Sequence, residues 1–328
     1  MAPASHPLQT SFRVADANLL RNKNGYCRNC DKPPSKVKEE RFLQCTGCKI
    51  ALYCTFIHHT SACRPQCKFI QESLEMIEAL REGADDAEHA TLDRRLTVHA
   101  LLRDFLEAHR LALRIIASAS LFLNGGSAFA FGAEPQILVV PLRFLPSSIS
   151  SPIDPARAFQ LGKGVFLPLA RVLAESARNG TRLVKMWDAA EGYRARLAVG
   201  EQRGNPWFTG LLPVLYRAET GATSIEYYPQ CAEDAPFLAE RPTVDSERAK
   251  MRMQERFIEL GVFLRPDPRA AKGEEQAYVP GYLRRSGSKW VWKPVFEDFY
   301  NDAEWNGTRP ENRMAVMERR VAALRRSR

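Results

Sequence analysis

Histidine is missing from the last two thirds of this sequence, and cysteine is nearly so. All six histidines precede residue 110, and Cys231 is the only cysteine outside the segment from Cys27 to Cys67. The region after residue 110 therefore offers no imidazole as a general base and no set of thiol and imidazole ligands for a metal ion. We expect metal chemistry in the N-terminal part alone.

Long apolar runs are also missing. The closest is "LALRIIASASLFL", residues 111–123, which is shorter than a membrane-spanning helix and contains Arg114. The N-terminus, "MAPASHPLQTSFRVADANLL", lacks the basic start and apolar core of a secretory signal. These absences predict an intracellular protein, in the nucleus or the cytoplasm, with no membrane partner. In a reducing compartment, clustered cysteines indicate metal binding rather than disulfides.

An excess of positive charge raises the question of a nucleic-acid partner. The 328 residues carry a formal net charge of +9, and the segment from Arg21 to Lys68 has ten Lys or Arg against three Asp or Glu. Metal-bound thiolates would offset much of that local excess, because each carries a negative charge. The segment also lacks a long basic helix, so nucleic acid is the alternative partner and a protein is the favoured one. Nothing in the sequence indicates a small-molecule substrate.

Composition and periodicity divide the chain into four parts. Residues 1–24 are expected to form a flexible tail, 25–69 a finger, 70–130 a helical segment, and 131–328 a mixed domain that ends in a basic helix. The predicted fold class is α+β: a small zinc-stabilised finger, a long helix over 92–123, and a mixed α+β domain.

Apolar periodicity predicts the elements of the mixed domain. Pro141, Pro213 and Pro294 favour edge or bulged positions for their strands. Met253, Phe257 and Leu260 are expected on the apolar side of a helix over 245–261. The other expected elements are strands at 136–144 and 182–187, a helix at 167–178, and hairpins that join 211–218 to 223–229 and 278–285 to 289–295.

The C-terminal segment "ENRMAVMERRVAALRRSR" predicts an amphipathic helix. Met314, Met317, Val321 and Leu324 recur on one helical face, and the arginines lie elsewhere. A helix docked on the domain with a solvated basic face is favoured over a localisation signal or a nucleic-acid patch.

Eight residues of the N-terminal part have the spacing of zinc ligands. A CxxC pair lets one tight turn direct two thiolates to one ion, and residues four apart lie on one side of a helix. Eight ligands suffice for two closed tetrahedral zinc sites. The sequence has two pairs of each kind: Cys27 with Cys30, Cys45 with Cys48, Cys54 with His58, and Cys63 with Cys67. His59 is the alternative to His58.

This pattern resembles the MYND-type zinc finger. The resemblance rests on "CRNC", "CTGCKIALYC" and the final pair of ligands, and it covers residues 27–67. A finger before a long helix and a mixed domain is also similar to the layout of fungal MYND proteins. The resemblance implies two structural Zn²⁺ ions with interleaved ligands. One ion would be held by Cys27, Cys30, Cys54 and His58, and the other by Cys45, Cys48, Cys63 and Cys67.

Two departures from the family pattern bear on function. His58 stands where the family usually has cysteine, and Cys63 stands early, where the family usually has histidine. The glutamine that usually follows the sixth ligand is His59 here, and the first tryptophan of the chain is Trp187. The metal sites are expected to be intact, whereas the family's groove for proline-rich peptides is in question.

The expected function is a non-enzymatic one, in which the finger docks a protein partner and the α+β region serves as a scaffold. Four protein ligands on each ion leave no position for an activated water. The enzyme alternative is a SET-type lysine methyltransferase, because some of these contain a MYND finger. Only 26 residues precede Cys27, however, and the sequence has no Asn-His-x-Cys motif.

Overall fold

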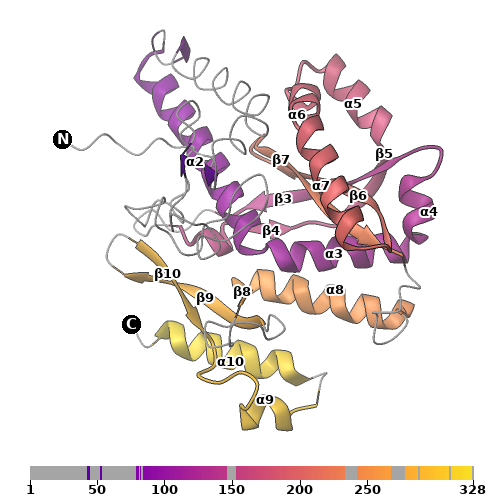
Figure 1. Cartoon of the computed structure of the whole chain (residues 1–328). Helices are drawn as coiled ribbons and strands as arrows, with labels where there is room; N and C mark the ends of the chain where they lie inside the picture. The colour runs from indigo at the N-terminus through magenta and orange to yellow at the C-terminus, as the bar shows by residue number, and fades with distance from the viewer. Residues whose placement is uncertain are drawn as a thin grey trace.

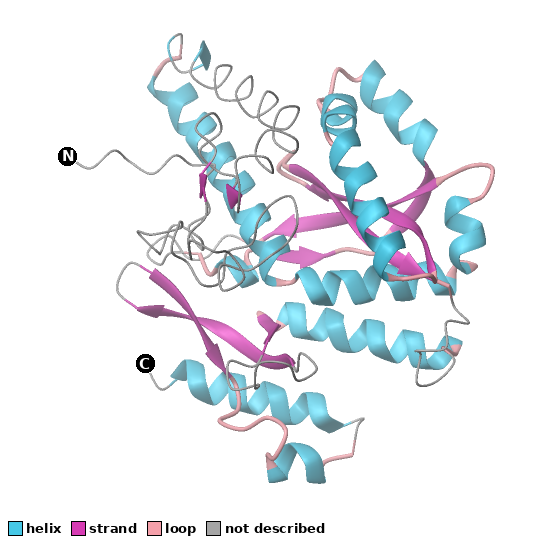
Figure 2. Ribbon diagram, in the orientation of Figure 1, coloured by secondary structure: helices cyan, strands magenta, loops and turns pink. Residues whose placement is uncertain are grey.

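The protein has a mixed α+β architecture, which confirms that part of the predicted fold class (Figures 1 and 2). The structure, a computed structural model, describes residues 43–44, 52–53, 79–80, 82, 84–145, 153–232, 242–266, 278–286, 289–309 and 312–326. The predicted tail lies outside these ranges, and so does the predicted finger except for residues 43–44 and 52–53.

The helix predicted over 92–123 is a pair of helices that meet at His109. α2 spans Asp86–Ala108 and α3 spans Arg110–Leu123. Asp85 and Glu88 form a capping box at the start of α2, since each side chain accepts a hydrogen bond from the other's backbone N–H. α3 ends before Gly125, whose φ of 106° favours glycine, and the short helix α4 follows at Gly126–Phe131.

The larger sheet contains the predicted strand at 136–144 and the predicted hairpin after it. Its order is β4 (Phe159–Leu161), β3 (Gln136–Phe144), β6 (Phe208–Ala218) and β7 (Thr223–Cys231), with β5 (Val165–Pro168) also paired to β3. β3 and β6 run parallel, and the other pairs are antiparallel. The hairpin of β6 and β7 confirms the prediction from the sequence.

Pro141 lies inside this sheet rather than at its edge, beside an irregularity where the register of β3 shifts by one residue between β4 and β5; of the two predicted positions, edge or bulge, the edge is wrong. β4 pairs with residues 142–144 of β3, and β5 pairs with residues 136–139 on the same side. The carbonyl oxygen of Pro141 accepts from the Gly162 N–H in the break between those strands. A residue's N–H and C=O point to the same side of a strand, so the missing N–H of Pro141 faces this break and no ladder bond is lost.

Three helices follow β5 and cover one face of the larger sheet: α5 (Leu169–Arg178), α6 (Leu183–Ala189) and α7 (Glu191–Gly204). α5 confirms the helix predicted at 167–178. The strand predicted at 182–187 is wrong, because this segment forms α6. A short apolar run of this kind is compatible with a strand or a helix. In the structure, Leu183 of α6 packs in one cluster with Ile137, Val172 and Leu215.

The opposite face of the larger sheet packs on α2 and α3 to form the main core. Phe105, Leu113, Leu138 and Tyr216 are among its fully buried members. α8 (Val244–Glu259) lies along α3 and begins at a capping box of Thr243 and Ser246, one residue from the predicted start. Phe257 is buried in a neighbouring core as predicted, but Met253 is 38% exposed and Gln254 is buried instead. The predicted apolar face of α8 is therefore wrong at Met253.

A smaller antiparallel sheet and two helices complete the C-terminal part. The sheet order is β10 (Lys289–Pro294), β9 (Tyr278–Ser286) and β8 (Val262–Pro266), which confirms the predicted hairpin. α9 spans Ala303–Gly307 and α10 spans Arg313–Arg326. Val316, Met317 and Val321 of α10 are buried against this part, so the prediction of a docked helix is confirmed. Among the described helices, none has the length and apolar character to cross a membrane.

Candidate functional site

The predicted zinc ligands all lie outside the described residues. These are Cys27, Cys30, Cys45, Cys48, Cys54, His58, Cys63 and Cys67, together with the alternative ligand His59. The described part of the finger is one antiparallel strand pair, β1 (Leu43–Gln44) and β2 (Leu52–Tyr53). The zinc sites therefore stay predictions.

The register of β1 and β2 relates this strand pair to the ligand pattern. Leu43 pairs with Tyr53, and Gln44 pairs with Leu52. In the sequence, Cys45 comes directly after β1, on the side of the connecting segment, and Cys54 comes directly after β2, at the other end of the ladder. The hairpin thus separates the chain positions of the second and third ligand pairs.

The part of the chain that the structure describes contains no group of three or more His, Cys, Asp or Glu side chains placed to hold a metal ion. Cys231, the cysteine outside the cluster, is half-buried at the end of β7, and its Sγ accepts a hydrogen bond from Asn205 Nδ2 at 2.9 Å. One thiol held in this way does not form a metal site by itself.

His109, at the junction of α2 and α3, is a fully buried titratable side chain. Its Nε2 lies 2.8 Å from the carbonyl oxygen of Ala156, and its ring packs edge-on against Phe105 and Phe263. A carbonyl only accepts, so Nε2 carries the proton, and Nδ1 is buried without a hydrogen-bond partner among the described residues. Burial lowers the pKa of His109 to about 4, although the bond to Ala156 opposes this shift. His109 therefore acts as a neutral structural group.

Two tyrosine hydroxyls meet inside the main core. Tyr216 Oη and Tyr228 Oη, from neighbouring strands β6 and β7, are 3.1 Å apart. Burial is the largest cause of a pKa above the ordinary tyrosine value at both residues. Each hydroxyl stays protonated and one of the two donates to the other, so this pair also has a structural role.

Arg194 of α7 is stacked on aromatic side chains from two other elements. Its guanidinium carbon lies 3.9 Å from the ring centre of Trp187 and 5.5 Å from that of Tyr227. Its Nη1 donates to the carbonyl oxygen of Trp187 at 2.5 Å and to Tyr227 Oη at 3.2 Å. Since α7 has no buried residue of its own, these contacts are a main attachment of α7 to α6 and β7.

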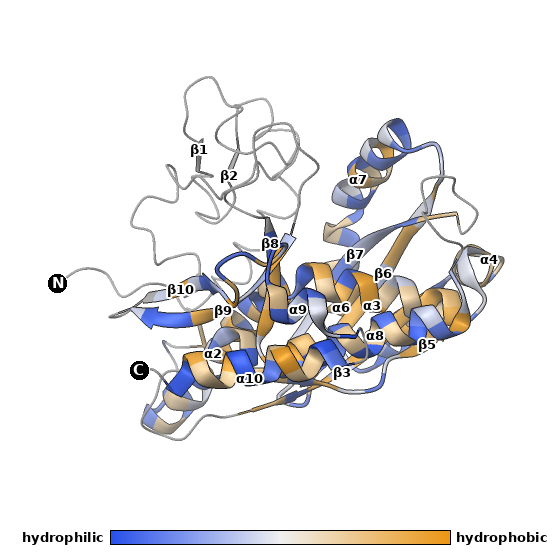
Figure 3. Cartoon of the chain, turned by 90° about the horizontal axis from the view of Figure 1, so that it is seen from below, coloured by the Kyte–Doolittle hydropathy of each residue, from blue (hydrophilic) through white to orange (hydrophobic). Residues whose placement is uncertain are grey.

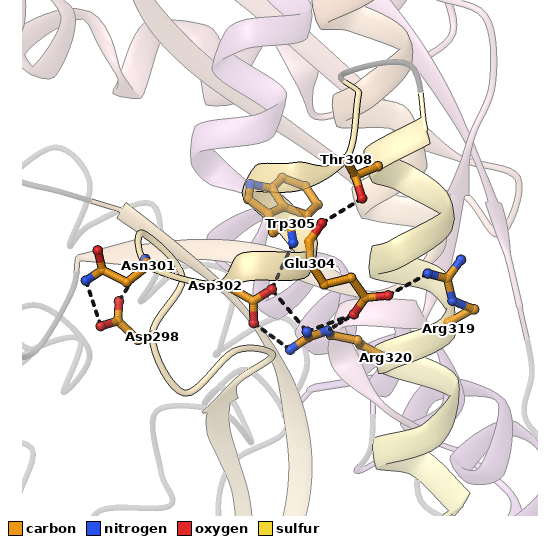
Figure 4. A network of polar contacts seen from close by, with 8 residues as sticks. All are labelled: Asp298, Asn301, Asp302, Glu304, Trp305, Thr308, Arg319 and Arg320. Atoms are coloured by element: carbon orange, nitrogen blue, oxygen red, sulfur yellow. Dashed lines mark hydrogen bonds and ion pairs between the residues drawn. The ribbon is translucent and has the colours of Figure 1, made fainter.

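A polar network holds α10 against α9 (Figure 4). Arg320 makes ion pairs with Asp302 at 2.9 Å and Glu304 at 2.8 Å, and Arg319 pairs with Glu304 at 2.6 Å. Arg319 and Arg320 hold the pKa of the Glu304 carboxyl below its usual value. At the other end of α10, Arg325 donates to the carbonyl oxygen of Leu260. The basic face is thus still solvated at Arg319, whose side chain is 64% exposed, while Arg319, Arg320 and Arg325 also make contacts within the protein.

No protein-family model matches the chain, and neither a curated protein nor a solved structure matches it. Function is therefore inferred from the residues of this chain.

The sequence patterns did not reveal His109 or Arg194 as key side chains. His109 lies four residues after Phe105 and four before Leu113 on the apolar side of the helices, which is the one local signal of its burial. Arg194 carries no local signal, because its partners come from α6 and β7.

Proposed function

We propose that this chain is a zinc-binding MYND-like finger protein that serves as a non-enzymatic interaction or regulatory scaffold. Two structural Zn²⁺ ions would fold the finger, the finger would dock a protein partner, and the α+β region would carry it. The observation that supports this proposal is the set of four ligand pairs at metal spacing between Cys27 and Cys67, in a chain with one further cysteine.

The register of β1 and β2 is consistent with the interleaved ligand assignment. Cys45 follows the strand pair on the side of the connecting segment, and Cys54 follows it at the opposite end. Ligands that leave a ladder in opposite directions are better suited to two different ions than to one. This favours Cys45 and Cys54 on different ions. The full sets, Cys45 with Cys48, Cys63 and Cys67, and Cys54 with Cys27, Cys30 and His58, follow from the resemblance to the MYND finger.

Zinc in these sites would have a structural role. With four protein ligands each, the ions would have no open position for water or substrate, and each would contribute on the order of 10 kcal/mol to the folding of a module with little hydrophobic core. The closely bonded pairs elsewhere, His109 with Ala156 and Tyr216 with Tyr228, are buried and have structural partners. Catalysis is therefore not part of the proposal.

Nucleic acid is the weaker candidate partner. The net charge of +9 favours it, but Arg319, Arg320 and Arg325 of the basic C-terminal helix are engaged with Glu304, Asp302 and the Leu260 carbonyl. Arginines that are paired with carboxylates of the same protein contribute less to phosphate binding than unpaired ones would.

A pull-down with the intact protein and a Cys27→Ser/Cys30→Ser variant tests the docking role. The variant should lose one zinc site and, with it, the partners that bind through the finger. The control is Cys231→Ser, which removes a thiol outside the cluster and should retain all partners. If the intact protein and the finger variant captured the same partners, docking through the finger would be excluded.

A further inference from the structure

The outer edge of the smaller sheet is built from β10. In the described part of the chain, β10 pairs with β9 alone, and its other edge meets no strand. Val291 lies opposite Arg284, and Lys293 lies opposite Tyr282. The hairpin of β9 and β10 extends from the body of the protein in both views, with hydrophilic colouring toward its end (Figures 1 and 3).

Among the described residues, no strand pairs with the backbone groups that β10 presents at this edge. Val295 N–H donates to the Pro280 carbonyl at 2.9 Å, so the bonds toward β9 come from alternate residues, including Val291 and Lys293. The N–H and C=O groups of Trp290 and Trp292 therefore point away from β9. The two N–H donors and two C=O acceptors of Trp290 and Trp292 can therefore pair with the backbone of one added strand.

The side chains give this edge two different faces. Trp290 and Trp292 are half-buried and pack toward a core of Ala108, Ala156, Phe263 and Leu283, and the Trp292 ring lies against Gly281. On the other face, Val291 is 38% exposed, and Arg284 and Lys293 are exposed. An added strand would meet an apolar position at Val291 between basic positions.

Charge determines which occupant fits the edge. Residues 278–294 contain Arg284, Arg285, Lys289 and Lys293 and no Asp or Glu. A second copy of β10 paired antiparallel about Val291 would bring lysine opposite lysine, at 289 and 293, and like charges in that position are unfavourable. Lysines on an edge strand commonly oppose such self-association, and they leave an acidic strand as the matching partner.

We propose that β10 binds an extended acidic segment of a partner protein as a fourth strand of the smaller sheet. The segment would place an apolar residue beside Val291 and a carboxylate beside Lys293, and its backbone would pair with Trp290 and Trp292. This gives the proposed scaffold a second interaction surface, and it does not depend on the zinc sites.

The test uses the full-length protein and a labelled peptide, Thr-Glu-Thr-Val-Thr-Glu-Thr, with its lysine counterpart Thr-Lys-Thr-Val-Thr-Lys-Thr as a control probe. Binding is measured by fluorescence anisotropy at low salt. The acidic peptide should bind and the lysine peptide should not. Arg284→Glu/Lys293→Glu should weaken binding of the acidic peptide by about tenfold or more, because the pair of Lys293 with a carboxylate becomes repulsive and Arg284, on the same face one strand further away, adds to the repulsion. Arg94→Glu/Arg95→Glu, an equal charge change at exposed positions of α2, should change it less than about twofold.

Two further measurements separate strand addition from simple charge attraction. The acidic peptide should slow hydrogen exchange at the Trp290 and Trp292 amides, and a version N-methylated at alternate residues should lose binding. No binding of the acidic peptide, equal losses in the two double variants, or full binding of the N-methylated peptide would overturn the proposal. So would capture of single-stranded DNA by the hairpin without capture of the peptide. None of these outcomes would change the zinc content or the finger-dependent pull-down.

Discussion

His109 and Ala156 tie the junction of α2 and α3 to the short helical turn at Pro155–Arg157. The imidazole Nε2 donates to the Ala156 carbonyl oxygen at 2.8 Å, while Phe105 and Phe263 enclose the ring. The bond joins residues 47 positions apart in the sequence. Because the ring is buried and neutral, the folded state binds a second proton on this imidazole less readily than the unfolded chain does.

Acid should therefore destabilise the protein through His109. A pKa of about 4 in the folded state lies below the ordinary value of 6.5, so the unfolded state binds more protons between these values. The stabilisation is complete above about pH 6.5 and is lost as pH falls toward 4, by about 3 kcal/mol in total. Urea unfolding of the wild type across this range would measure the loss.

The matched variant is His109→Gln, which keeps a donor for the Ala156 carbonyl and removes the titration. Its stability should fall less steeply with acid than that of the wild type. The pKa of His99 is also lowered, by burial and by Arg103, so the variant should keep the part of the pH dependence of stability that comes from His99. If the free energy of unfolding fell equally with pH in the wild type and in His109→Gln between pH 6.5 and 4, His109 would not be the source of the acid sensitivity.

Gly281 and Gly200 should respond in opposite directions to alanine. A Cβ at Gly281 would run into the Trp292 ring, whereas a Cβ at Gly200, in the exposed helix α7, would meet nothing within 4 Å. We expect Gly281→Ala to lower the free energy of unfolding by about 1–3 kcal/mol. We expect Gly200→Ala to raise it by about 0.5–1 kcal/mol, since alanine favours helix over glycine. Equal shifts in denaturant midpoint would rule out the close contact at Gly281.

Replacing Arg194 should loosen α7 without unfolding the sheet below it. Arg194→Ala removes the stacking on Trp187 and Tyr227 and two hydrogen bonds, so amide exchange in residues 191–204 should accelerate on the order of tenfold. Arg194→Lys should behave similarly, because an ammonium lacks the planar stacking surface of the guanidinium. Arg203→Ala, an exposed change on the same helix, is the control and should leave exchange unaltered. Unchanged exchange in Arg194→Ala would mean that other contacts hold α7.

Local patterns were sufficient for much of the fold. The strand at Gln136–Phe144 and both hairpins follow from alternating apolar residues and turn residues close in sequence, and α10 follows from its repeat of apolar positions. What the sequence could not show depends on distant partners. The parallel pairing of β3 with β6 brings Leu138 beside Val214, and Pro141 is tolerated because β4 and β5 leave a break beside it.

Among the residues of the candidate site, too, only those with a local sequence signal could be predicted. The cysteine pairs are a local signal, which is why their spacing predicts metal ligands without a structure. The burial of His109 and the stacking of Arg194 depend on Ala156, Trp187 and Tyr227. The segment of α6 is predicted as a strand because its few apolar residues fit the periodicity of a strand as well as that of a helix. Only their packing against the sheet selects the helix.

Substitution of the two neighbouring histidines should separate the predicted ligand from its alternative. His58→Ala should lower the zinc affinity of one site, because a tetrahedral site would lose one of four ligands. His59→Ala should bind zinc as the wild type does. Competition with a chromophoric chelator measures both, and the reverse result would reassign the ligand to His59.

The most direct test of the account is the zinc content of the purified full-length protein, measured by elemental analysis against protein concentration. Eight ligands in two closed sites predict two zinc ions per chain, and Cys231→Ser should not change that number. A value near one would mean that one of the two sites is not formed, and a value near zero would contradict the proposal of a zinc finger altogether.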